Sequence, residues 1–228
     1  MKVTKITKDD LDENNYYRPS ESLYADGSIE IADNLGIVRF KGFLIAAGSI
    51  TAEAGSSIEA GSWIEAGTWI EAGSSIEAGS LIKAGTWIEA GTWIEAGWGI
   101  EAGSSIKAGW GIEAGWGIEA GSGIEAGSSI EAGAAIEAGR GIKAGAAIEA
   151  GTWIEAGSSI KAGWGIEAGL QISAKKTISA KLRIFAGICN WRNPLPEEMT
   201  ITAQRVEGEV GSGVVKLLGT DPASPTES

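Results

Sequence analysis

Isoleucine returns at every sixth position from Ile58 to Ile184 without interruption, 22 times in all. The repeating unit reads x-x-Ile-Glu-Ala-Gly, as in residues 62–67. Because the period is even, the alternation of a β-strand is kept from unit to unit, so Ile and Ala point to one side and Glu to the other. The pattern predicts an all-β fold, a single-stranded β-solenoid of hexapeptide repeats capped at both ends.

Glycine closes each unit, at 19 consecutive corners from Gly61 to Gly169. A bend at every sixth residue needs either a positive φ or a backbone without a Cβ, and glycine provides both. After Gly169 the corner positions are occupied by Lys175 and Lys181, and then by Gly187. The last regular coil is therefore expected to bend differently from the coils before it.

The size of one coil depends on how many hexapeptides it contains. Three give a triangular prism of 18 residues per coil, and two give a flat solenoid of 12. The unit resembles the hexapeptide signature of left-handed β-helices, in which an aliphatic residue is followed by a small or acidic one, and this resemblance favours 18. Four tryptophans depart from it, because they stand where a small inward residue is expected; the glycine after each predicts an indole turned outward. They leave a 12-residue coil and a right-handed path open and are Trp98, Trp110, Trp116 and Trp164.

Breaks in the period divide the chain. Leu44 and Ile50 are six apart but Ile58 follows eight later, which predicts a two-residue insertion near Ala52 and Glu53. Near the C-terminus, residues 199–203 and 213–218 are expected to pair as two strands over the end of the solenoid. The expected parts are a polar N-terminal arm or short capping segment (1–27), a strand-rich cap (28–57), the solenoid (58–187), a C-terminal cap (188–220) and a disordered tail (221–228).

Candidate catalytic groups are scarce, since the chain has no histidine and one cysteine, Cys189. The resemblance to left-handed β-helices implies acyltransferases or γ-class carbonic anhydrases, which use histidine as a base or a metal ligand. Neither activity can be carried over to a residue of this chain. Cys189, beside Ile188 and Trp191, is interpreted as a small core residue. We therefore predict a protein that is not an enzyme, with no catalytic residue, no metal ligand and no cofactor.

The location of the protein is predicted from what the chain lacks. Residues 1–20 contain no apolar stretch typical of a signal peptide, and no run approaches the length of a membrane span. A single cysteine rules out an internal disulfide framework, which fits a reducing compartment. The sequence predicts a cytoplasmic protein that does not enter a membrane.

The net charge of −12 is unevenly distributed. Residues 58–169 contain 15 Glu against four Lys and one Arg, whereas residues 170–192 contain five cations and no acid. We call these five the basic collar, and they are Lys175, Lys176, Lys181, Arg183 and Arg192. An 18-residue coil aligns the outward charges in three columns. One is interrupted by Lys83, and one mixes Glu71, Glu89 and Glu125 with Lys107, Lys143 and Lys161. The third column, a candidate acidic interaction face, is Glu59, Glu77, Glu95, Glu113, Glu131, Glu149 and Glu167.

The acidic column can be interpreted as a feature that keeps the protein soluble or as one of two kinds of binding surface. Carboxylates about 5 Å apart repel by roughly 1 kcal/mol in water, so the column costs stability unless the side chains splay or cations bind. Outward Glu keeps a strand face soluble and discourages lateral sheet pairing. The alternatives are a ladder of divalent ions, or imitation of a phosphate backbone in the manner of acidic pentapeptide-repeat proteins, which resemble DNA to their partners.

Nine of the ten tryptophans lie in the array. With 18 residues per coil, Trp69 is expected to stack on Trp87 and Trp98 on Trp116. Such rows either stiffen the rod by cross-strand stacking or form an aromatic interface for a ligand or a second copy. The basic collar is a weak footprint for nucleic acid beside so acidic a body. We expect it to meet the acidic body of the next molecule end to end.

The chain also resembles bactofilins, bacterial polymer-forming β-helical proteins, in residues 45–50 (Ile-Ala-Ala-Gly-Ser-Ile) and in the array. It resembles uncharacterised bacterial and phage-associated proteins with Ile-Glu-Ala-Gly repeats as well. The leading hypothesis is a structural or interaction β-solenoid that forms a homo-oligomer or binds a protein partner, without nucleic acid or membrane. The alternative is an acidic inhibitor of a nucleic-acid-binding protein.

Overall fold

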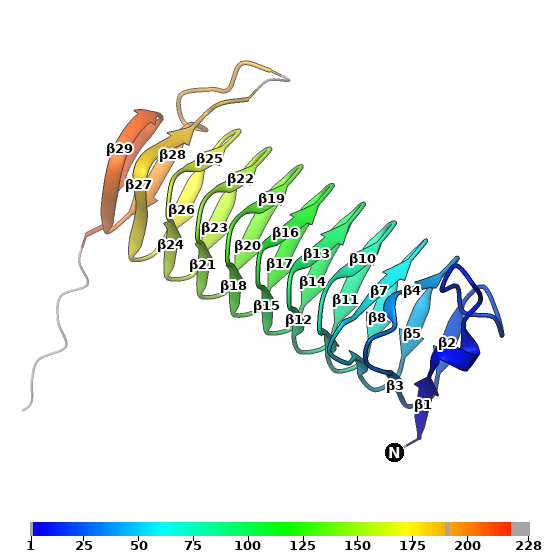
Figure 1. Cartoon of the computed structure of the whole chain (residues 1–228). Helices are drawn as coiled ribbons and strands as arrows, with labels where there is room; N and C mark the ends of the chain where they lie inside the picture. The colour runs from blue at the N-terminus through cyan, green and yellow to red at the C-terminus, as the bar shows by residue number, and fades with distance from the viewer. Residues whose placement is uncertain (1, 190–191, 220–228) are drawn as a thin grey trace, which may run out of the picture.

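The computed structural model describes residues 2–189 and 192–219. Over these ranges the chain winds into a β-solenoid, whose stacked coils are seen in Figure 1. The solenoid has about 11 turns with about 18 residues per turn. The predicted β-solenoid and its 18-residue coil are confirmed, and the 12-residue coil is wrong. At a strand spacing of about 4.8 Å, the rod is about 50 Å long. No helix in the described part of the chain has the length and apolar character needed to span a bilayer.

One side of the prism, which we call the acidic face, carries the continuous Glu column. Its strands pair in parallel with Ile on Ile and Glu on Glu, as Ile76 pairs with Ile58. The strands are β4 (Gly36–Phe40), β7 (Ser56–Ala60), β10 (Ile76–Ala78), β13 (Trp93–Ala96), β16 (Gly111–Ala114), β19 (Ile130–Ala132), β22 (Ile148–Ala150), β25 (Ile166–Ala168) and the second half of β27 (Thr177–Ala186).

The second side, the Lys83 face, follows the acidic face along the chain. It runs from the first coil to the last without interruption. Its strands are β2 (Leu23–Ala25), β5 (Leu44–Ala46), β8 (Ile64–Ala66), β11 (Leu81–Ala84), β14 (Gly99–Ala102), β17 (Gly117–Ala120), β20 (Ala135–Ala138), β23 (Ile154–Ala156), β26 (Ile172–Ala174), β28 (Thr200–Ala203) and β30 (Val214–Leu217).

The third side is the Lys143 face. At its C-terminal end β29 (Arg205–Ser212) pairs with both halves of β27, with a register shift between Ser179 and Arg183, and so spans the corner to the acidic face. The other strands are β1 (Val3–Ile6), β3 (Ser28–Ile31), β6 (Ile50–Ala52), β9 (Ile70–Ala72), β12 (Ile88–Ala90), β15 (Ser105–Ala108), β18 (Gly123–Ala126), β21 (Gly141–Ala144), β24 (Ser159–Ala162) and the first half of β27.

The core is a column of isoleucine side chains inside the prism. All 22 array isoleucines are 0 or 1% exposed, and the alanine two residues after each is buried beside them. Burial of one such side chain stabilises the fold by roughly 1.5–3 kcal/mol relative to leaving it in water. The long solenoid is therefore held by many repeated, local contributions between neighbouring coils.

The array glycines are required because neighbouring coils approach closely, and not because of their dihedral angles. No glycine from Gly61 to Gly169 has a positive φ. A Cβ added at Gly109 would lie 2.0 Å from the carbonyl oxygen of Gly91 one coil earlier. Of the two reasons that the sequence offers, the structure thus shows the second. The predicted change after Gly169 is also present, because β27 runs through the corner at Lys181 as one ten-residue strand.

The first coil is made by residues 2–27, which were expected as a polar arm or a short capping segment. After β1 a single 3-10 turn, η1 (Lys8–Asp10), leads to a bridge between Tyr16 and Arg39 of β4, and the chain then enters β2. The ring of Tyr17 lies 5.4 Å from that of Phe40. Ile6 and Leu11 are fully buried. This segment therefore covers the N-terminal end of the core.

The predicted insertion is confirmed by the strand register. Ile50 pairs with Ile70, 20 residues later, whereas Ile58 pairs with Ile76, 18 residues later. The extra residues form a turn in which the Ser56 amide donates to the Glu53 carbonyl at 3.0 Å. The first coils are thus longer than those of the array.

After β27 the chain leaves the rod and returns at β28. The predicted pairing near the C-terminus is confirmed, since Thr200 pairs with Val214 in parallel. The two strands were expected to lie over the end of the solenoid, but they continue the Lys83 face as its last two strands. The inward positions of the last strand are Val215 and Leu217, and they are 41% and 67% exposed. The expected disordered tail (221–228) lies outside the described residues.

Candidate functional site

The acidic column has the geometry that the period predicts. Each Glu pairs in register with the Glu one coil away, as Glu77 does with Glu59 and with Glu95. The pKa values of Glu77 and Glu131 are raised, first because partial burial disfavours the charged carboxylate and second because the neighbouring carboxylates repel it. At Glu77 and Glu131 the charged carboxylate is therefore disfavoured, and a cation placed over either residue would relieve the part that comes from repulsion.

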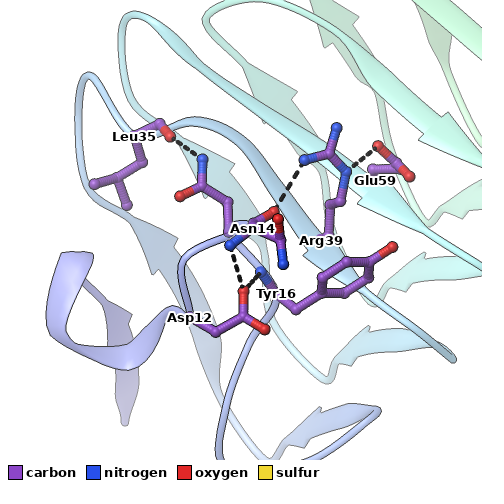
Figure 2. A network of polar contacts seen from close by, with 7 residues as sticks. Asp12, Asn14, Tyr16, Leu35, Arg39 and Glu59 are labelled. Atoms are coloured by element: carbon purple, nitrogen blue, oxygen red, sulfur yellow. Dashed lines mark hydrogen bonds and ion pairs between the residues drawn. The ribbon is translucent and has the colours of Figure 1, made fainter.

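A cation closes the N-terminal end of this column, and sequence reasoning missed it. The Arg39 Nε lies 3.0 Å from a carboxylate oxygen of Glu59, and Nη1 donates to the Asn14 carbonyl at 3.1 Å. Figure 2 shows how the Asp12 carboxylate holds that loop by accepting the amides of Asn14 and Tyr16. Arg39 precedes Glu59 by 20 residues, so an 18-residue spacing does not align the two. The Ala52–Glu53 insertion was the signal that could have shown the alignment.

At the other end the column stops on an aromatic residue, since Glu167 pairs with Phe185. A shallow groove of about 400 Å³ follows the downstream edge of the acidic face. Four carboxylates of the column line it, together with Ile188 and the small residues of the corner. The acidic face thus offers a continuous, open and negatively charged track along most of the rod.

The other two columns contain the predicted cations, and three of these are paired. The distances are 2.8 Å from Lys83 to Glu101, 3.1 Å from Lys107 to Glu89 and 2.6 Å from Lys143 to Glu125. Each pair joins residues 18 apart, on adjacent coils. Because all six side chains are largely in solvent, each pair contributes only about 0–1 kcal/mol to stability.

Two cations of the array behave differently. Lys161 pairs in register with Lys143, so two ammonium groups stack on adjacent coils. Neither Lys161 nor Arg140 has an ion pair with a described residue. Both line a groove of about 450 Å³ on the Lys143 face, together with Lys107 and Lys143. This groove is the place in the acidic array where cations outnumber carboxylates.

The aromatic prediction is half right. The rings of Trp69 and Trp87 stack at 4.9 Å with an interplanar angle of 4°. Trp98 and Trp116 are 63% and 64% exposed, and within the described residues their rings form no stacked pair. The glycine after each does turn the indole outward, as predicted, and at the corner the two rings point into solvent.

The outward tryptophans border a second hollow. A groove of about 580 Å³ on the Lys83 face is lined by Trp98, Trp116 and Trp153, with Glu101, Glu119 and Glu137 along its other side. Gly117 and Ala135 form the floor where other coils carry a large side chain. The candidate aromatic interface is therefore two separate features, a stacked pair on the Lys143 face and an open groove on the Lys83 face.

The basic collar is partly neutralised by acids that follow it in the chain. Arg192 forms two hydrogen bonds of 2.6 Å with Glu198, and Arg183 lies 3.7 Å from Glu209. Hydrogen bonds from Arg192 and from the Leu195 amide lower the pKa of Glu198 to about 2. The other three collar residues, Lys175, Lys176 and Lys181, stand at corners of the prism. The collar is thus a scattered set of cations and does not form one continuous ring.

Little in the described residues suggests covalent or metal chemistry. Cys189 is a free, half-buried thiol. Among the residues that the structure describes, no three Cys, Asp or Glu side chains are grouped closely enough to hold a metal ion. No protein-family model, curated protein or solved structure matches this chain. Its function is therefore argued from its surfaces.

Proposed function

We propose that this protein is a structural β-solenoid without enzymatic activity, and that it associates with copies of itself through the open coil at its C-terminal end. One observation carries the proposal. The N-terminal end of the core is covered by residues 2–27, whereas the described residues of the last coil leave the inward side chains of β30 in solvent. The two ends of the same rod thus differ in what they offer a partner.

The last coil exposes main chain as well as side chains. In the described part of the chain β29 pairs only with β27, and β30 pairs only with β28. The outer edges of both strands therefore carry amide and carbonyl groups directed away from the rod. An uncovered edge of this kind is a template for pairing with another chain.

A second copy of the same end is the partner that fits these edges. Val215 and Leu217 provide apolar contact at the centre, and the strand edges provide hydrogen-bonding groups around it. Two identical ends related by a two-fold axis form a closed contact, in which each edge serves the other. The covered N-terminal end would remain outside this dimer.

Size-exclusion chromatography with light scattering tests the proposal. At high salt, where side-to-side charge contacts are screened, the wild-type protein should elute at twice the 23.4 kDa chain mass. The double variant Val215→Lys with Leu217→Lys should elute at the chain mass, because charges on the edge oppose pairing. Leu195→Lys, at an exposed position away from the last coil, is the matched control and should remain a dimer. A monomeric wild-type protein at every concentration would refute the end contact.

A second function is supported by the unbroken carboxylate column. Charges repeated at the coil spacing of about 4.8 Å give a linear acidic track, which fits an inhibitor that imitates a nucleic acid backbone. In competition with double-stranded DNA for purified histones, the wild-type protein should displace DNA at low salt. A Glu113→Gln and Glu131→Gln variant should displace it less; equal displacement would exclude this function.

A further inference from the structure

The Lys143 face contains charges that its own chain leaves unbalanced. Every other lysine of the array has a carboxylate on an adjacent coil, but Lys161 is stacked between Lys143 and Ser179. Arg140 stands at a corner where the neighbouring coils carry Ser122 and Ser158. Arg140, Lys143 and Lys161 are thus gathered over two coils of a strongly acidic array. Lys143 pairs with Glu125 at 2.6 Å, whereas Arg140 and Lys161 have no ion pair with a described residue. Their arrangement costs repulsion unless an anion lies over them.

The fold does not require the glycine that lies beneath these cations. A Cβ at Gly123 would have its nearest contact 3.5 Å away, at the Gly141 carbonyl oxygen. This is ordinary packing distance, in contrast to the 2.0 Å at the corner glycine Gly109. Gly123 also lacks a positive φ. The backbone would accept a side chain here, and its absence keeps the groove open to an incoming surface.

The acidic face is complementary to this groove in charge and in spacing. Both are built on successive coils of the same solenoid, so their outward charges repeat with the same rise of about 4.8 Å. Opposite charges on two such ladders can meet rung by rung when two rods lie side by side. The acidic face also lacks cations between Glu77 and Glu167, so its carboxylates are available for that contact.

We infer that the acidic face of one copy docks on the Lys143 face of a second copy, with Glu113 and Glu131 on successive coils opposite Lys143 and Lys161, and with Arg140 at the corner beside Lys143. The contact joins two different faces, so each rod keeps one face free and the assembly grows sideways. It rests on the proposed self-association and adds a lateral contact to the end contact. Because the charges are exposed, added salt weakens it.

A charge exchange between the two faces tests this inference. All proteins carry Val215→Lys and Leu217→Lys, which removes the end contact. The first variant adds Lys143→Glu with Lys161→Glu, and the second adds Glu113→Lys with Glu131→Lys. Each alone should be monomeric by light scattering at low salt. An equimolar mixture should associate, because each variant offers the face that matches the other, and high salt should reverse this.

The matched control is Lys83→Glu with Lys216→Glu, which makes the same charge change on the Lys83 face alone. This control should associate at low salt as the end-blocked parent does. A mixture of the two exchange variants that stays monomeric would overturn the lateral contact, as would binding of inorganic pyrophosphate by the groove with no association. A parent that is monomeric at low salt, while the wild-type protein associates, would refute the lateral contact and leave the end contact standing.

Discussion

The body of the rod and its C-terminal end share one strand register but differ in how they are closed. In the body every inward Ile is covered by the next coil, and every corner is a glycine fitted against a carbonyl oxygen. At the end, Lys175 and Lys181 replace the corner glycines, and the inward residues of β30 are exposed. The body carries the excess of carboxylates, and the residues of the basic collar lie near the C-terminal end.

This difference shows which parts of the molecule a partner can recognise. A uniform repeat buries its core and satisfies its main chain at every coil, so the interior of the body offers nothing to a partner. Departures from the repeat change only the surface or the end: the cations over Gly123 and Gly141, the groove beside Trp98, and the open edge of β30. Each self-association that we propose has one of these departures on at least one side of the contact, and none involves the buried core.

The largest expected effect breaks a corner of the body. Gly109→Ala would place a Cβ 2.0 Å from the Gly91 carbonyl oxygen, so neighbouring coils must move apart. We expect the free energy of unfolding to fall by about 3 kcal/mol or more. Urea unfolding followed by circular dichroism measures this change.

Lys181→Ala is the matched change at the end of the rod. Lys181 already has a Cβ and an exposed side chain, so the free energy of unfolding should change by less than about 0.5 kcal/mol. Equal effects of Gly109→Ala and Lys181→Ala would contradict the view that the two regions close their corners differently.

A smaller effect separates two kinds of tryptophan within the body. Trp69→Ala removes a ring stacked on Trp87 at 4.9 Å and should lower the free energy of unfolding by about 1–3 kcal/mol. Trp98→Ala removes an exposed ring and should cost less than about 0.5 kcal/mol. Thermal or urea unfolding of the two variants checks this order, and a larger cost for Trp98→Ala would reverse our assignment of the groove as surface.

The smallest effect concerns pH, and its sign differs between the two regions. In the body, the raised pKa of Glu77 means that the folded state binds a proton more tightly than the unfolded chain. The contribution of Glu77 to stability should therefore rise as the pH falls from 7 through that raised pKa toward 4.5. Glu77→Gln should stabilise the protein at pH 7 by about 0.5 kcal/mol or less and should have no advantage at pH 4.

At the C-terminal end the sign is opposite. The pKa of Glu198 is lowered to about 2, so its contribution to stability is present above pH 4.5 and is lost as the pH falls toward 2. Unfolding of Glu198→Gln beside the wild-type protein at pH 6 and pH 3 should show a difference that shrinks with acid. A difference that grows would contradict the Arg192–Glu198 pairing.

The body could be predicted from the sequence because one even period fixes both the strand register and the side of each residue. The pairing of Glu77 with Glu59 and the opposition of Lys143 to Glu125 follow from it directly. The role of the corner glycines was also partly predictable, because a bend at every sixth residue requires a residue without a Cβ or with a positive φ. The structure adds that close approach between coils, and not a positive φ, is the reason.

What the period could not predict lies where the count of residues per coil changes. Arg39 meets Glu59 only because the first coils are longer, and the segment around Leu11 covers the core although its composition is polar. The absence of stacking between Trp98 and Trp116 depends on the direction of side chains at a corner, which strand alternation does not define. The period separates Gly123, directly before Ile124, from the corner glycines Gly121 and Gly127, but it does not show that a Cβ would fit at Gly123 and that cations line a groove above it.

Hydrogen exchange at increasing protein concentration tests the central claim, association through the last coil, most directly. Measured at high salt, the amides of residues 214–217 in β30 should exchange more slowly as the concentration rises, because a second copy covers that edge. The amides of β1 at the other end, residues 3–6, should exchange at the same rate throughout. Exchange in β30 that does not depend on concentration, or equal slowing in β1, would contradict the claim.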